Sequence, residues 1–260
     1  MERNASHVQS VERALRLIDL LAQEGREMSL TEISRAMEWP KSTVHGLLAT
    51  LRDYQFVDQS PSTGHYYLGV RLFELGNQVA RSWNIRTMAM PVMQRLNSRL
   101  GEMVQLATED KGEVLYIEKI DSTQMFRIVS DIGVRLPMHC SGLGKVLLAF
   151  KTPAEVKYIL SRKGQKAMTR RTITDPRELE LELAKVREQG YAVDDREIMD
   201  SLRCIAAPIF DRECRVQYAI SISGLPNVLS GDRFDTALEA VREAAEEISF
   251  AMGHRESMAK

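Results

Sequence analysis

Polar residues at the start of one short helix form the first group that could do chemistry. Residues 40–46 read Pro-Lys-Ser-Thr-Val-His-Gly. Lys41 brings positive charge, and Ser42 and Thr43 bring hydroxyls that can donate to phosphate oxygens or base edges. His45 lies four residues beyond Lys41 and therefore on the same helix face. This set suits contact with DNA, although polar residues at a helix start are also commonly solvent-facing.

A second group of residues has the composition of an anion-binding site. Residues 141–145 read Ser-Gly-Leu-Gly-Lys and precede an apolar run, so their glycines let backbone N–H groups converge on a carboxylate at a helix N-terminus. Further along, Ser221 and Ser223 alternate with isoleucines in a strand-like segment. The two hydroxyls would share one strand face, about 7 Å apart. Serine pairs of this kind are more often exposed to solvent than bound to a ligand.

Cysteine chemistry offers two alternatives to simple ligand binding. The chain has three cysteines, Cys140, Cys204 and Cys214, in no CxxC spacing, so neither a disulfide framework nor a structural zinc site is expected. Cys204 with His139 could form a nucleophile pair, and His139, Cys140 and Cys204 could hold a metal. Because Ile205-Ala206-Ala207-Pro208 follows Cys204 as an apolar strand, we instead expect a buried thiol, no catalytic residue, no metal and no cofactor.

The elements around Lys41 predict a winged helix-turn-helix. Ser29-Leu30-Thr31-Glu32 is a capping box that opens a short helix, and Pro40 separates it from the helix that carries Lys41. Two short strands then flank the turn-rich segment 60–64, which suits a wing hairpin. Of the wing residues, Thr63, His65 and Tyr66 are candidates for contact with the DNA backbone or minor groove.

Helices are expected on both sides of this motif. Before it, apolar residues recur at helical spacing up to a stop at Gly25; they are Val11, Leu15, Ile18 and Ala22. After it, Leu72, Leu75 and Val79 repeat with helical period through residues 70–83. We interpret this segment as a linker helix whose apolar stripe packs against a partner chain. The alternative is a solvated spacer.

The remaining chain predicts an α+β domain around one antiparallel sheet. A helix opened by Pro91 precedes a hairpin of strands at 104–108 and 114–120, and a loop at 136–145 leads into another helix. Asp175 caps a helix that stops at Gly190. Strands follow at 191–194, 204–210 and 216–223, and an amphipathic helix closes the chain. We therefore divide the protein into a DNA-binding domain (1–69), the linker helix (70–83) and a ligand-binding domain (84–260).

Composition limits the classes of protein to consider. The 260 residues are 44% hydrophobic and 27% charged, which suits two globular domains and argues against disorder. No apolar run is long enough to span a membrane, and the polar N-terminus lacks a signal-peptide core. We expect a soluble cytoplasmic protein without a membrane partner. Residues 1–83 hold nine Lys and Arg against ten Asp and Glu, so DNA binding cannot rest on a basic surface.

Six segments in the same order resemble the IclR family of bacterial transcriptional regulators over nearly the whole chain. They are residues 10–22, 29–51, 66–76, 136–149, 190–195, and 202–211 together with 219–224. The resemblance implies an N-terminal winged helix-turn-helix and a GAF-like effector-binding domain. It also implies double-stranded operator DNA as a partner and a homodimer that often pairs into a dimer of dimers. Gly46 departs from the family, which usually has a large basic residue there.

The resemblance also assigns an effector site for a small oxoacid or hydroxyacid. It implies main-chain contacts from Gly142 and Leu143, and side-chain contacts from Asp194, Cys204, Ser221 and Ser223. An ionised carboxylate repels an anionic ligand, so we expect Asp194 to face a ligand hydroxyl or to carry a proton. The function expected is a ligand-responsive regulator, most commonly a repressor in this family. The alternatives are a cysteine-dependent metabolic enzyme with an appended helix-turn-helix and a constitutive DNA binder.

Overall fold

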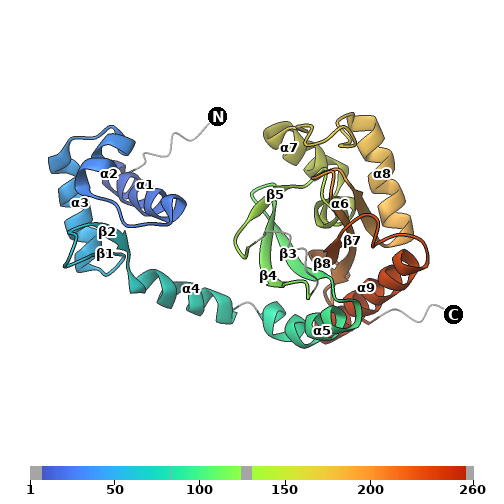
Figure 1. Cartoon of the computed structure of the whole chain (residues 1–260). Coiled ribbons are helices and arrows are strands. Elements are labelled where there is room, and N and C mark those ends of the chain that lie inside the picture. The colour runs from blue at the N-terminus through green and yellow to red at the C-terminus, as the bar shows by residue number, and fades with distance from the viewer. Residues whose placement is uncertain (1–7, 83, 124–130, 256–260) are drawn as a thin grey trace. The chain divides into compact units, whose positions relative to one another are not determined.

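The computed structural model describes residues 8–82, 84–123 and 131–255 (Figure 1). The chain forms two compact units, Met1–Trp83 and Asn84–Lys260, and each has its own hydrophobic core. Residue 83, the last of the predicted linker helix, lies outside the described residues.

The first unit is a winged helix-turn-helix. Its elements are α1 (Gln9–Glu24), α2 (Leu30–Met37), α3 (Lys41–Asp53), β1 (Val57–Gln59), β2 (Tyr66–Leu68) and α4 (Val70–Ser82). The capping box at α2 is confirmed, since the Ser29 N–H donates to the Glu32 carboxylate (2.8 Å) and the Glu32 N–H donates to the Ser29 hydroxyl (3.3 Å). Strands β1 and β2 pair antiparallel to form the wing.

Helix α1 buries a stripe shifted from the one predicted: of the predicted residues, Ile18 packs against the core of the first unit, but Val11, Leu15 and Ala22 are exposed. Leu17 and Leu21 enter the core of the first unit, whereas Val11 and Leu15 are 56% and 57% exposed. Both stripes have helical spacing, and only one of them can face α2 and α3. Periodicity alone cannot tell which stripe that is, because the choice depends on the orientation of α1 against the other helices.

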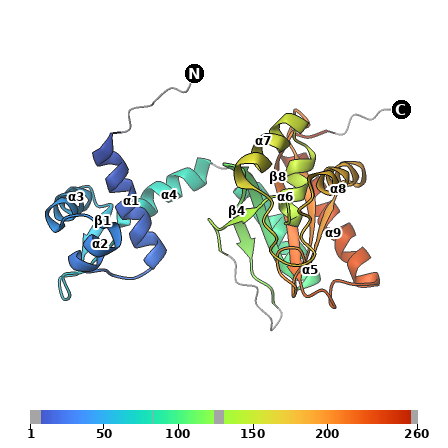
Figure 2. The same ribbon diagram turned by 90° about the horizontal axis from the view of Figure 1, so that it is seen from above.

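The second unit is an antiparallel sheet between two layers of helices (Figure 2). The strand order is β5-β4-β3-β8-β7-β6. Helices α5 and α9 pack on one face of the sheet, and α6 and α8 pack on the other. The elements are α5 (Asn84–Leu100), β3 (Met103–Asp110), β4 (Glu113–Ile120), β5 (Arg135–Pro137), α6 (Gly142–Ala149), α7 (Pro153–Lys163), α8 (Pro176–Gln189), β6 (Ala192–Asp195), β7 (Arg203–Phe210), β8 (Val216–Gly224) and α9 (Asp232–Ala251).

Three features of the second unit differ from the sequence prediction. Pro91 lies inside α5, which already begins at Asn84, so the prediction that proline opens this helix was wrong. The ring is on the exposed side of the helix, where the carbonyl that loses its N–H donor can turn to solvent. Strand β5 and helix α7 were not predicted. Helix α7 has a capping box of its own, Thr152 with Glu155, which is a signal that the sequence reading missed.

No helix in the described part of the chain is both long and apolar enough to cross a membrane.

Candidate functional site

The first turn of α3 presents the predicted DNA-contacting residues. Val44 and Leu48 are fully buried and anchor α3 in the core. Helical geometry therefore turns Lys41, Ser42 and His45 outward, and all three are exposed, while Thr43 is half-buried. The structure thus brings these four residues together at one helix end.

Gly46, the departure from the family pattern, is not required by packing. It is exposed, and a Cβ added at this position would have no heavy atom within 4 Å. The position would therefore accept a larger side chain, including a basic one.

The wing residues divide into outward and inward positions. Thr63 is exposed and its hydroxyl donates to Glu27 (3.0 Å), while its own oxygen accepts the N–H of His65 (3.2 Å). Tyr66 is only 5% exposed and belongs to the core of the first unit. The prediction that Tyr66 contacts DNA was wrong, because strand alternation turns Tyr66 inward and its backbone pairs with Met28.

Three strands of the second unit bring the predicted effector side chains into one row, and β3 adds Gln105 to it. Asp194 pairs directly with Cys204, and Cys204 pairs with Ser223. Ser221 lies two residues along β8, opposite Gln105 of β3. Directly paired residues of an antiparallel sheet point to the same face, so these side chains share the face that α6 covers. All of them are buried.

Hydrogen bonds join the members of this row. The Ser221 hydroxyl donates to Oε1 of Gln105 (3.1 Å). The Ser223 hydroxyl lies 2.8 Å from the same oxygen and 3.0 Å from Sγ of Cys204, within hydrogen-bonding distance of both. The row therefore offers hydroxyl, amide and thiol groups that can exchange partners with a ligand.

The N-terminus of α6 sits against the same row. A Cβ placed on Gly142 would lie 3.3 Å from Cβ of Ala206 and 3.6 Å from the Asp194 nitrogen, so the helix start is in close contact with β6 and β7. Gly142 and Leu143 are the first two residues of α6, and their N–H groups have no acceptor within the helix. The structure thus brings all six predicted effector residues together.

Asp194 has a carboxyl group that is only partly satisfied. Its Oδ1 accepts the N–H of Glu197 (2.7 Å), whereas Oδ2 is buried without a hydrogen-bond partner among the described residues. Burial raises the pKa of Asp194 from 3.8 to about 7, the Glu197 N–H opposes this, and the Glu197 charge adds to it. Next to it, burial acts to raise the pKa of Asp195, but hydrogen bonds from Arg203 leave that pKa lowered. Because successive residues of a strand point to opposite faces of the sheet, the carboxyl groups of Asp194 and Asp195 lie on opposite faces.

Lys145, a buried lysine of α6, uses all of its hydrogen-bond donors on groups of the protein. Lys145 is 1% exposed, and its Nζ donates to Glu182 (3.0 Å), the Val193 carbonyl (2.6 Å) and Glu197 (2.5 Å). An ammonium group has three N–H bonds, so all of its donors are used. This cation holds α8 and the segment after β6 together and has no donor left for a ligand.

Comparison with known proteins shows the family to which the chain belongs. Residues 10–61 match the IclR helix-turn-helix domain, and residues 77–250 match the bacterial transcriptional regulator IclR C-terminal model. The chain belongs to the IclR family. It is a helix-turn-helix transcriptional regulator, and the predicted fold is confirmed. IclR-family regulators bind operator DNA and small-molecule effectors.

Individual members of the IclR family are similar over nearly the full chain. The HTH-type transcriptional regulator XynR of Escherichia coli K12 is 37% identical, over 95% of this chain and 98% of the relative. The transcriptional repressor IclR of the same strain is 36% identical over 95% and 90%. An IclR homologue from Microbacterium hydrocarbonoxydans, complexed with 4-hydroxybenzoate, has 27% identity and a TM-score of 0.84 over 94% and 99% of the two chains.

The cysteine alternatives find little support in this IclR-family structure. Burial, followed by the Asp194 charge, raises the pKa of Cys204 well above its usual value, and a neutral thiol is a poor nucleophile. The ring of His139 hydrogen-bonds the Lys166 carbonyl (3.1 Å). In the described ranges of the chain, no group of three or more His, Cys, Asp or Glu residues could hold a metal ion.

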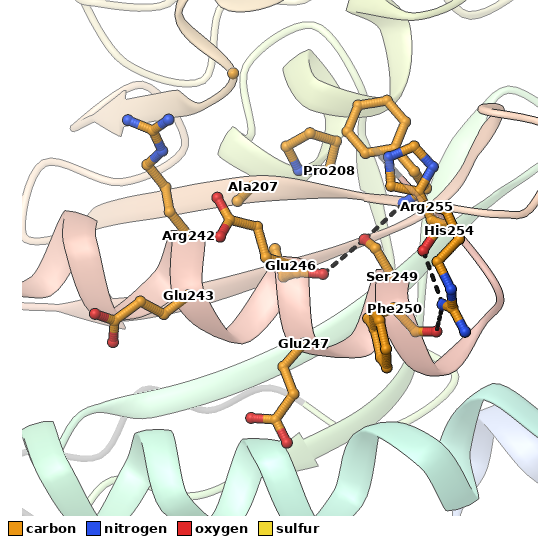
Figure 3. Close-up of a pocket in the computed structure, with 13 residues that line it drawn as sticks. Ala207, Pro208, Arg242, Glu243, Glu246, Glu247, Ser249, Phe250, His254 and Arg255 are labelled. Atoms are coloured by element: carbon orange, nitrogen blue, oxygen red, sulfur yellow. Dashed lines mark hydrogen bonds between the residues drawn. The ribbon is translucent and has the colours of Figure 1, made fainter. Parts of the chain in front are cut away.

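One cavity of the second unit lies away from the predicted effector residues. A cavity of about 780 Å³ opens between α9 and the outer end of β7 and contains none of the predicted residues (Figure 3). Beside this cavity, the residues of β7 beyond Ala206 are not paired with β6 and form an edge of the sheet. Pro208 has no N–H, and the N–H of Phe210 donates to the Ser249 hydroxyl (2.9 Å). This edge is therefore closed to the addition of another strand.

Three polar residues of the site were missed or left without a role at the sequence level. Gln105 stands in the apolar strand Met-Val-Gln-Leu, and a polar residue in such a run is a signal that could have been used. Lys145 was named only as the end of the glycine-rich segment. Glu197 gave no signal, because it follows β6 in an irregular segment whose course depends on the tertiary fold.

Gly144 is the glycine of α6 that packing requires. A Cβ there would overlap the carbonyl oxygen and Cα of Met138. We expect Gly144→Ala to lower the free energy of unfolding by about 1–3 kcal/mol through forced displacement of this backbone. Urea denaturation measures the change. Gly46→Ala is the matched control, expected to stabilise by about 0.5–1 kcal/mol because its site is open; equal effects of the two variants would contradict the packing argument.

Proposed function

We propose that this protein is a cytoplasmic, effector-responsive repressor of a catabolic operon that releases its operator when it binds a small oxoacid or hydroxyacid. The observation that carries the proposal is the convergence of Asp194, Cys204 and Ser223 in one row against the N-terminus of α6. Backbone N–H groups at a helix start suit a carboxylate, and the row suits its hydroxyl or oxo group.

Related proteins support this class of function and ligand. The relative IclR of Escherichia coli is a transcriptional repressor. The Microbacterium homologue is complexed with 4-hydroxybenzoate, a hydroxyacid. A ligand that fits the row of this chain must likewise present a carboxylate and a hydrogen-bonding group.

Operator binding would place α3 of two copies in successive major grooves. Lys41, Ser42, Thr43 and His45 would contact bases and phosphates, and Thr63 and His65 would contact the backbone from the wing. Pairing as a homodimer, or as a dimer of dimers, is supported by apolar side chains that the first unit leaves exposed. They include Val11 and Leu15 of α1 and Val70 and Phe73 of α4. Effector binding would act through α4, by favouring one of two arrangements of the paired DNA-binding domains.

Selection of genomic DNA fragments by the purified protein tests the proposal. We expect an enriched palindromic site, and a panel of small oxoacids and hydroxyacids should contain one that weakens binding to it in fluorescence anisotropy. Turnover of an acid without an effect on DNA would favour the enzyme alternative. Enrichment of a site with no response to any acid would favour a constitutive DNA binder.

Lys41→Ala tests the placement of α3. Loss of one phosphate contact should weaken operator binding by about 1 kcal/mol, roughly fivefold, and reduce the slope of log K against log salt by about one. A salt titration of operator anisotropy measures both quantities. Lys185→Ala, an exposed lysine on α8, is the control that should change neither. An unaltered slope in Lys41→Ala would place this helix end away from DNA.

A further inference from the structure

A groove between α7 and α8 contains none of the predicted effector residues. These two helices follow each other in the chain (Figure 1). Their side chains line a cavity of about 650 Å³. Its apolar floor is made by Val156, Leu160, Leu179, Leu183 and Ala184. The volume is in the range of small-molecule sites, and an apolar floor is the usual lining of such sites.

The rim of this groove is positively charged. Lys151, Lys157 and Arg187 line it against a single carboxylate, Glu180. Lys151 is paired with Glu109 (3.0 Å). Lys157 and Arg187 have no carboxylate within ion-pair distance among the described residues. The groove thus combines an apolar floor with two cations that have no acidic partner.

Two polar groups of the groove can donate to a ligand oxygen. Nε of Arg187 donates to the Ala149 carbonyl (2.6 Å), which fixes the guanidinium at the end of α6. Gln165 also lines the groove, and its Nε2 is shielded from solvent without an acceptor among the described residues. A buried amide N–H without an acceptor costs free energy, which a ligand oxygen would recover.

We propose that the α7–α8 groove is a second small-molecule site, for an amphipathic carboxylate with an aliphatic or aromatic body. The body would cover Leu160 and Leu183, and the carboxylate would meet Arg187, Lys157 and the Gln165 amide. A fully polar acid would leave the apolar floor exposed to water. A neutral apolar molecule would leave the two cations without an anionic partner.

The groove is separate from the proposed effector site. Leu179 and Leu183 belong to the same core cluster as Leu143, but Leu143 and the other predicted effector residues do not line the groove. A molecule in the groove does not contact Asp194 or the serines of β8, and the proposal does not depend on the effector that they bind.

Titration with sodium octanoate, followed by amide NMR of the full chain, tests the proposal. We expect shifts concentrated in α7 and α8, while 1-octanol and acetate bind at least tenfold more weakly. Ala184→Trp fills the groove and should weaken octanoate binding at least tenfold. Leu181→Trp places the same side chain on α8 at a position that is 72% exposed and does not line the groove, and it should leave binding unchanged.

Two further variants test the contribution of the rim charge and the location of the octanoate site. Lys157→Gln should weaken octanoate binding by about threefold, with Lys185→Gln as an unaffected control on α8. Binding should persist in Asp194→Asn. The proposal is overturned if millimolar octanoate shifts no resonance of α7 or α8, or if 1-octanol binds as tightly. It is also overturned if Ala184→Trp, shown by thermal unfolding to be folded, binds octanoate as the unmodified protein does, or if only Asp194→Asn loses binding.

Discussion

Replacement of Lys145 by methionine is expected to lower the free energy of unfolding by about 3–5 kcal/mol, because it leaves buried carboxylates without their cation. Burial acts to lower the pKa of Lys145, but the charges of Glu197 and Glu182 outweigh it and the pKa is raised above its usual value. Lys145 is therefore charged in the folded protein. Its three hydrogen bonds join α6 to α8, to β6 and to the segment after β6, so its loss affects the face of the sheet that carries the effector row.

Urea denaturation of Lys145→Met measures this loss. The double variant Lys145→Met, Glu197→Gln should recover part of it, since it removes the more deeply buried of the two unpaired charges. Lys185→Met replaces an exposed lysine of α8 and should change stability by less than about 0.5 kcal/mol. A loss of under 1 kcal/mol in Lys145→Met, as an order of magnitude, would mean that the carboxylates become protonated at little cost.

Binding of an anionic oxoacid is expected to weaken about tenfold per pH unit above pH 7, because Asp194 must be neutral beside the bound carboxylate. The pKa of Asp194 is raised to about 7, so the neutral form dominates below that value and is lost above it. A hydroxyacid whose hydroxyl donates to Oδ2 of Asp194 would bind the ionised form as well. Its affinity should then change little across the same range.

Isothermal titration of the acid found in the operator assay, between pH 6 and pH 9 as an approximate range around this pKa, measures the slope. Asp194→Asn keeps the shape of the side chain and should abolish the pH dependence for an oxoacid. Asp195→Asn is the matched control on the opposite face of β6. Equal slopes in Asp194→Asn and the unmodified protein would remove Asp194 from the proposed effector site.

The raised pKa of Asp194 also makes the free energy of unfolding depend on pH. Between 3.8 and about 7 the folded protein keeps the Asp194 proton, whereas the unfolded chain releases it. The contribution of Asp194 to the free energy of unfolding therefore falls as pH rises through this window and is constant above it.

Local signals in the sequence were sufficient for many elements of the fold. The capping box at Ser29, the cap of α8 at Asp175 and the left-handed glycines Gly25 and Gly190 all lie where the sequence predicts helix ends. These features depend on hydrogen bonds within a few residues of chain, so the residue types determine them. The same holds for the alternation that puts Ser221 and Ser223 on one face of β8.

Other decisions required the tertiary structure, because they depend on residues far apart in the chain. The sequence could not choose between the two apolar stripes of α1, turn Tyr66 inward, or show that Pro91 lies within α5. By itself it determined a winged helix-turn-helix followed by a ligand-binding α+β domain. Only the tertiary structure placed Gln105 opposite Ser221. It also supplied the three hydrogen-bond acceptors of Lys145, which lie on α8, on β6 and in the segment after β6. Finally, it left one carboxylate oxygen of Asp194 without a partner among the described residues. Burial and pairing across strands decide these properties, and neither is encoded in local spacing.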